Sequence, residues 1–114
     1  MTTKHISPQR IQLSRLKGWR MPPNTVKVDR TTRWGNPFIA GKHGDRARCA
    51  YLFRALLCGH LCISVDEATV DAQRRYLRMA NGFIDELEGK NLACWCLLTA
   101  PCHADVLLEV AAHP

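Results

Sequence analysis

A short apolar segment near the C-terminus, Asn91 to Cys96, most constrains how this chain of 114 residues can fold. It reads Asn-Leu-Ala-Cys-Trp-Cys and lies between a Gly89-Lys90 turn and a loop over residues 97–101. A compact apolar run bounded by turn residues is typical of a strand buried in the middle of a sheet. We therefore predict a sheet with this segment at its centre.

Hydrophobic periodicity predicts the other elements. Alternating apolar and polar residues indicate two short strands in the first third of the chain, and helical spacing follows the N-cap residues Asp45 and Asp66. The predicted elements are strands at 10–15, 25–29 and 91–96 and helices at 46–58, 66–87 and 102–112, with Asn81-Gly82 as a break in the second helix. This order predicts an α/β or α+β fold, with a short mixed sheet flanked by helices.

Length and composition indicate one domain. The hydrophobic fraction of 46% and the charged fraction of 23% are near the globular average. We expect residues 1–9 to form a flexible N-terminus and residues 10–114 to form the single α/β domain. The longest uncharged stretch, 91–103, is too short and too polar to span a bilayer, and no secretion signal is recognisable. We therefore expect a soluble, cytoplasmic protein with no membrane partner.

The net charge of +6 is concentrated in the N-terminal part of the chain, since residues 1–48 carry +9 and residues 49–114 carry −3. This asymmetry indicates an anionic partner, a nucleotide or a nucleic acid, although an ordinary solvated surface has the same pattern. Basic residues interleaved with an aromatic are typical of nucleic-acid contacts, and a charge-protected edge strand is the alternative. The candidate nucleic-acid contacts are Arg10, Arg15, Lys17, Trp19 and Arg20.

The loop over residues 30–38 is the first candidate ligand site, because it follows a predicted strand and precedes a predicted helix. Its arginines can bind a phosphate, its tryptophan can stack on a ring, its glycine allows close backbone approach, and Asn-Pro makes a rigid turn. The predicted ligand-binding residues are Arg30, Arg33, Trp34, Gly35, Asn36 and Pro37. The alternative is an ordinary turn, with Trp34 and Phe38 packed in the core.

Six cysteines in a chain of this length, without a secretory signal, are expected to be reduced thiols. Three of them lie near the C-terminus. On the predicted strand Cys94 and Cys96 share one face, and Cys102 lies at a helix start, where the helix dipole lowers a thiol pKa.

Three interpretations of this C-terminal cluster stay open. The residue types suit zinc, although the spacing differs from the usual Cys-x2-Cys pattern. A reactive cysteine beside a histidine base is the second interpretation, and a packed core is the third. The candidate zinc ligands are Cys94, Cys96, Cys102 and His103, and the candidate catalytic residues are Cys96, Cys102, His103 and Asp105.

The mid-chain cysteines and the remaining histidines receive no predicted role. Because Gly59 interrupts the helical spacing, we expect Cys58 and Cys62 to be buried or half-buried thiols rather than a ligand pair. The other residues without an assigned role in the loops and termini are His5, His43 and His113.

Three segments together resemble a known family. They are residues 10–22, the Arg-Trp-Gly-Asn-Pro-Phe motif at 33–38, and residues 89–109 with Cys-Trp-Cys and Cys-His. This combination is similar to the domain-of-unknown-function family 4326, over nearly the whole chain. The resemblance implies a phage or prophage origin and no established activity. It also implies that the Asn-Pro and Cys-His loops, the family's signature segments, form one site, and that the mid-chain thiols, Cys49 included, lie outside the pattern.

These observations lead to one main hypothesis and two alternatives. We expect the two loops to meet at one sheet edge, if their strands are parallel neighbours, and to bind a phosphorylated, nucleotide-like ligand on which the protein could act. A non-catalytic, zinc-stabilised nucleic-acid-binding module that uses the basic N-terminal half is the alternative. A phage protein that binds a host protein through its basic face is the third hypothesis.

Overall fold

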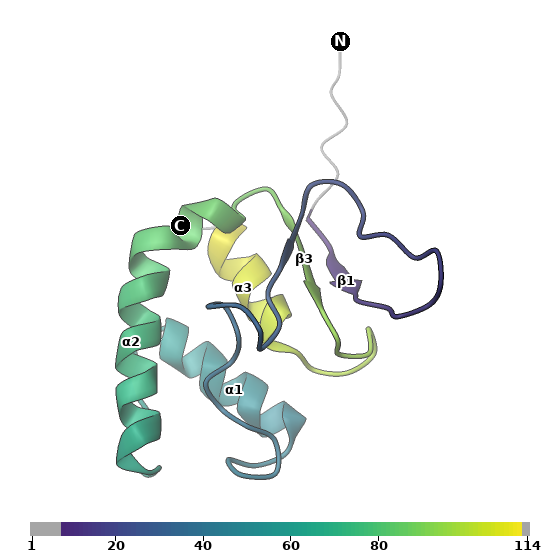
Figure 1. Cartoon of the computed structure of the whole chain (residues 1–114). Coiled ribbons are helices and arrows are strands. Elements are labelled where there is room, and N and C mark those ends of the chain that lie inside the picture. The colour runs from purple at the N-terminus through teal and green to yellow at the C-terminus, as the bar shows by residue number, and fades with distance from the viewer. Residues whose placement is uncertain (1–7, 113–114) are drawn as a thin grey trace.

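Three short parallel strands form the sheet in the computed structural model, which describes residues 8–112 (Figure 1). They are β1 (Arg10–Gln12), β2 (Thr25–Lys27) and β3 (Asn91–Cys94), in the order β1-β3-β2. Leu92 of β3 is paired with Arg10 on one side and with Val26 on the other. The predicted central strand is confirmed, and both pairings in the described residues are parallel, whereas a mixed sheet was expected.

The helices begin where aspartate side chains cap them. The carboxylate of Asp45 accepts a hydrogen bond from the backbone N–H of Arg48, and that of Asp66 accepts one from Thr69. The helix that contains Asn81-Gly82 runs through this pair and tightens into a 3-10 turn only after Phe83. The helical elements are α1 (Arg46–Leu57), α2 (Glu67–Phe83), the 3-10 helix η1 (Ile84–Leu87) and α3 (His103–Ala112). The predicted α/β class is thus confirmed.

The core lies between the sheet and the helices. Helix α3 packs on β3 and β1, α1 packs on α3, and α2 packs on α1 (Figure 1). Fully buried apolar side chains from every layer meet there, and each contributes about 1.5–3 kcal/mol by leaving water. They include Val28, Phe38, Phe53, Leu92 and Leu107.

Segment 13–24 carries the chain from the end of β1 back to the start of β2, so that both strands run parallel to β3 (Figure 1). Side chains alternate across the sheet, so Ala93 faces away from Leu92 and Cys94. Ala93 is nevertheless buried, as is Leu13, which follows β1. Leu16 and Met21 of segment 13–24 are exposed.

The N-terminal end of the described chain is tied to the sheet. The backbone N–H of Gln9 donates to the side-chain oxygen of Asn91, and the carbonyl of Gln9 accepts from Leu92. Residues 1–7 of the expected flexible N-terminus, His5 among them, and residues 113–114 with His113 lie outside the described residues. No helix in the described part of the chain is long and apolar enough to cross a membrane.

Candidate metal and ligand site

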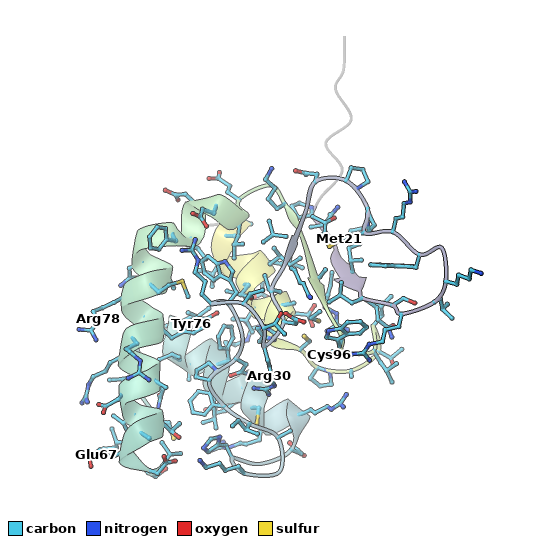
Figure 2. All side chains as sticks on the ribbon, in the orientation of Figure 1. Met21, Arg30, Glu67, Tyr76, Arg78 and Cys96 are labelled. Carbon is cyan, nitrogen blue, oxygen red and sulfur yellow. The ribbon has the colours of Figure 1, made fainter. Side chains whose placement is uncertain are left out.

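A pocket of about 430 Å³ opens where β2 and β3 end. The residues that line it come from the loop after β2, from the start of α1, and from the end of β3 and the loop between β3 and α3. Arg30 of the first loop and Cys96 of the second both border it (Figure 2). The structure therefore brings together the two loops singled out from the sequence, because parallel neighbouring strands end at the same sheet edge.

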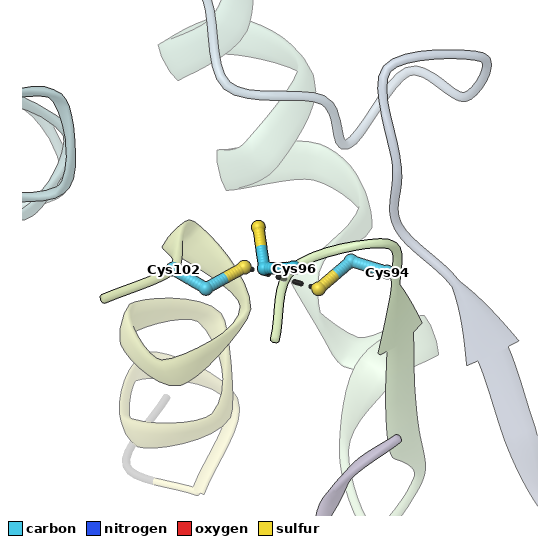
Figure 3. A group of neighbouring side chains, drawn as sticks. All are labelled: Cys94, Cys96 and Cys102. Atoms are coloured by element: carbon cyan, nitrogen blue, oxygen red, sulfur yellow. Dashed lines mark hydrogen bonds between the residues drawn. The ribbon is translucent and has the colours of Figure 1, made fainter. Parts of the chain in front are cut away.

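Three cysteine sulfurs converge on the wall of this pocket (Figure 3). The Sγ atoms of Cys94, Cys96 and Cys102 lie within 4.8 Å of one another, and those of Cys94 and Cys102 are 3.0 Å apart. Cys94 and Cys102 are buried, and Cys96 is half-buried. All six cysteines are free thiols, as expected. This cysteine triad could hold a metal ion, since thiolates are strong ligands for soft and borderline metals.

Hydrogen bonds within the triad distribute its protons unequally. Bonds to Cys102 and Cys94 hold the pKa of Cys96 well below its usual range. Bonds to Cys102 and Cys96, together with burial, raise the pKa of Cys94. The pKa of Cys102 is raised as well, because its bond to Cys94 lowers it less than its bond to Cys96 and burial together raise it. Cys96, the most accessible sulfur of the three, therefore carries the first negative charge.

His103 supports the triad rather than joining its ligand atoms. Its Nε2 lies 2.7 Å from the carbonyl oxygen of Val28, and since a carbonyl can only accept, this nitrogen carries the proton. Burial lowers the pKa of His103, so the ring is neutral, and its Nδ1 faces the Cys102 sulfur at 3.6 Å. Of the expected four-ligand set, the three sulfurs form the group of mutually close ligand atoms in the described chain, and His103 lies beside this group.

Two arginines supply positive charge to the pocket. Arg30 donates from Nη1 to the carbonyl of Asn36 at 2.9 Å and from Nη2 to that of Phe38 at 3.1 Å. These bonds fix the guanidinium against carbonyl dipoles and leave its charge in place. Arg46, which the sequence did not single out, borders the pocket from the first residue of α1. Asn36 closes the loop onto α1, because its buried side chain donates to the carbonyl of Cys49 at 3.3 Å.

Other residues predicted for the ligand loop lie outside the pocket. Arg33 forms an ion pair with Glu86, and its guanidinium lies over the ring of Phe83. Trp34 is packed in the core, 3% exposed. A Cβ at Gly35 would lie 2.8 Å from the Cα of Arg30, so this glycine allows close approach of the chain to itself rather than to a ligand. Pro37, half-buried, also lies outside the residues that line the pocket.

Arg10 and Asp105, predicted as a nucleic-acid contact and a catalytic group, bond to each other at 2.9 Å, outside the pocket. The Arg10 side chain is 6% exposed and also donates to the carbonyls of Leu97 and Ala100. It thereby fastens the cysteine-bearing loop to β1, which is a structural role.

Segment 13–24 carries the other predicted nucleic-acid contacts. Arg15, Lys17 and Arg20 are exposed, and Trp19 is half-buried. The guanidinium carbon of Arg15 lies 4.3 Å from the centre of the Trp95 ring. The basic side chains of this segment are therefore available at the surface.

Asp29 and Trp95 join the two loops, although neither was predicted to have a role. The indole Nε1 of Trp95 donates to the Asp29 carboxylate at 2.9 Å, and the hydroxyl of Thr31 donates to the same carboxylate at 2.6 Å. Asp29 is 5% exposed. A carboxylate at the last residue of the predicted strand 25–29 was the available signal, because the end of a strand lies at the sheet edge where ligands bind.

The mid-chain cysteines are distributed around the molecule. Cys49 is buried and borders the pocket, so it lies closer to the site than expected. Cys62 is half-buried, as predicted, whereas Cys58 is exposed, contrary to prediction. The reason is that Cys58 follows the end of α1, in a turn that Gly59 continues with a φ of 95°.

The family described as Domain of unknown function (DUF4326) matches residues 11–113. No curated protein matches the chain. No solved structure matches it either. The family match includes both loops that line the pocket and the whole cysteine triad. The chain therefore belongs to the family of the Domain of unknown function, DUF4326.

Proposed function

We propose that this protein binds a zinc ion through the cysteine triad and, beside the metal, a phosphorylated, nucleotide-like ligand. The observation that carries the proposal is that three sulfurs within 4.8 Å of one another share a pocket with Arg30 and Arg46. The sulfurs supply metal ligands and the arginines supply anion-binding donors, so one pocket offers both kinds of recognition.

The donor set supports zinc. Zinc is bound by four ligands in a tetrahedron, and sites with three protein ligands keep the fourth position for water or substrate. In such a site the metal lowers the pKa of bound water and polarises ligand oxygens. Cys96 connects the triad to the pocket, since it is the half-buried member of the three. The residues therefore suit a metal centre that a ligand can reach, and such a centre is compatible with an enzymatic role.

The pocket itself supports a phosphorylated ligand. Its volume of about 430 Å³ is in the range of small-molecule sites. Arg30 is exposed and already oriented by two carbonyls, so it can meet an anion with little reordering. Arg46 adds a second positive charge at the border of the pocket.

Zinc content tests the metal part of the proposal. Protein purified without a chelator or a metal-binding tag should contain about one zinc per chain, because three thiolates bind zinc tightly. Cys102→Ser should lose the metal, while Cys58→Ser, which changes an exposed thiol outside the triad, should retain it. A wild-type protein without zinc, or a Cys102→Ser variant that keeps it, would contradict the metal site.

A thermal shift tests the ligand part. A nucleoside monophosphate should raise the melting temperature of the wild type, because a ligand that binds the native state stabilises it. Arg30→Gln should reduce the shift, whereas Arg33→Gln, which changes an arginine that pairs with Glu86, should not. A panel of nucleotides without any shift would count against the proposed ligand class.

A second candidate function, nucleic-acid binding with the metal as a structural brace, is supported by the exposed basic side chains of segment 13–24. DNA or RNA affinity would then fall steeply with salt, because phosphate contacts release counterions. Lys17→Ala and Arg20→Ala should each reduce that salt dependence. Binding that does not depend on salt, or no binding, would exclude this candidate.

A further inference from the structure

We infer that Trp95 is a stacking platform for the base of the bound ligand, so that the pocket prefers a nucleotide with an aromatic base over a sugar phosphate. This inference rests on the proposed function, because it adds a base site to the phosphate site of the same pocket. Trp95 takes the place of Trp34, the residue for which the sequence suggested stacking.

Trp95 lies at the pocket with its ring accessible to solvent. It lies directly after β3, between two members of the cysteine triad, and it borders the pocket. It is 40% exposed, whereas Trp34 is 3% exposed and lies in the core. His103, whose ring also borders the pocket, is buried. Trp95 is therefore the residue here with both a large aromatic ring and access to solvent.

The ring of Trp95 is held in a fixed orientation. Its Nε1 donates to Asp29 at 2.9 Å, and Asp29 is itself held by the hydroxyl and the backbone N–H of Thr31. The indole N–H lies in the ring plane, so this bond leaves the ring faces free for other partners. A ring that is ordered before binding loses little freedom when a base stacks on it.

A flat cation already occupies one ring face. The guanidinium carbon of Arg15 lies 4.3 Å from the centre of the Trp95 ring, which shows that this face accepts a planar group. Arg15 is exposed, and a cation–π contact at an exposed site is weaker than the stacking of a base on tryptophan. Because Arg15 is not among the residues that line the pocket, we expect a base to stack on the Trp95 ring from the pocket side.

The charge around Trp95 fits the rest of a nucleotide. Arg30 and Arg46 border the same pocket and are the groups that would hold the phosphate. A base on Trp95 and a phosphate at the arginines together use the aromatic and the cationic walls of one cavity. A sugar phosphate would use the cationic wall alone.

Binding of AMP, UMP and ribose 5-phosphate to the metal-loaded protein tests the inference, with affinity measured by calorimetry and stacking by tryptophan fluorescence. We expect both nucleotides to bind about tenfold more tightly than ribose 5-phosphate and to quench the fluorescence. Trp95→Leu should weaken AMP binding about tenfold and leave ribose 5-phosphate unchanged. Trp95→Phe keeps an aromatic face and should lose less than Trp95→Leu.

Trp19→Leu is the matched control, because Trp19 lies on segment 13–24 and outside the residues that line the pocket. It should bind all three probes as the wild type does. If Trp95→Leu binds AMP normally, or loses AMP and ribose 5-phosphate equally, the base site is overturned and the phosphate site stands. If the wild type binds none of the probes, the proposed function fails together with the inference.

Discussion

Asp29 connects the two loops of the pocket through the hydrogen bonds of its carboxylate. Its carboxylate accepts from Thr31 on its own loop and from Trp95 on the other. Burial raises the pKa of Asp29, but the hydrogen bonds from Thr31 and Trp95 and the charge of Lys27 together outweigh it, so the net pKa is lowered. The ionised form is therefore the one that the folded protein stabilises.

This lowered pKa gives stability a defined pH dependence. Because the pKa of Asp29 in the folded state is below its ordinary value, the unfolded state takes up the proton first as the pH falls. The stabilisation is present above about pH 4 and is lost as the pH drops through the folded-state pKa. Urea unfolding at several pH values should show that the free energy of unfolding depends less on pH in Asp29→Asn than in the wild type. The exposed Asp71→Asn is the control, and equal slopes for Asp29→Asn and the wild type would contradict the prediction.

The residue scale also shows what sequence patterns leave out. The sequence predicted that the cysteine triad and Arg30 lie at one edge of the sheet, because Cys96 and Arg30 lie at or just after the ends of predicted strands. The ion pair of Arg33 was not predictable, since its partner Glu86 lies about fifty residues away in sequence. The burial of Trp34 was not predictable either, since Tyr76, whose hydroxyl donates to the backbone carbonyl of Trp34, lies about forty residues away. The sequence indicates that Arg10 is a surface charge, whereas its bonds to Asp105 and to the carbonyls of Leu97 and Ala100 give it a structural role.

Among the elements, the loop over residues 39–44 forms a wall of the pocket, and the side chain of His43 connects this loop to α2. His43 accepts at Nδ1 from the backbone N–H of Ile39 at 2.8 Å, and its Nε2 faces the hydroxyl of Thr69 at 3.3 Å. The His43 side chain is 4% exposed. Ile39 borders the pocket, so this histidine supports the wall from behind.

Removing the His43 side chain should destabilise the fold. His43→Ala deletes a buried side chain and leaves the N–H of Ile39 without its acceptor, so we expect the free energy of unfolding to fall by about 1–3 kcal/mol. Denaturant unfolding measures the change. His60→Ala, which alters an exposed histidine just beyond α1, should have little effect on the free energy of unfolding. Equal losses in the two variants would mean that the His43 contacts contribute nothing to stability.

The elements themselves were well predicted, because each carries a local signal. Asp45 and Asp66 mark helix starts through their side-chain caps, and the apolar run at 91–96 marks the central strand. Strand lengths were overestimated, since the ladder of β1 ends at Gln12 although the alternation runs on to Arg15. The parallel pairing was not encoded locally, because it depends on how segment 13–24 returns the chain.

At the scale of the whole molecule, the cysteine triad joins the end of the sheet to the start of the last helix. Cys94 ends β3, and Cys102 directly precedes α3. A metal bound between them would brace the sheet against the helix that covers it, and binding free energy would add to folding free energy. Stability and metal content should therefore change together.

A chelator tests this coupling. EDTA should lower the melting temperature of the metal-loaded wild type, because the native state then loses a bound ligand. Cys102→Ser should melt at a lower temperature than the wild type and should not respond to EDTA. A wild-type protein that holds zinc but melts at the same temperature with and without the chelator would show that the metal contributes nothing to folding.

The order β1-β3-β2 has a consequence for synthesis, because the central strand is the last strand to be made. Until residues 91–94 have left the ribosome, β1 and β2 have no partner in the sheet, and Arg10 lacks the loop that it binds. Pairings between residues this far apart in sequence are slow to form. The nascent chain therefore emerges with β1 and β2 unpaired, and the sheet and its pocket assemble together only after residues 91–94 have emerged.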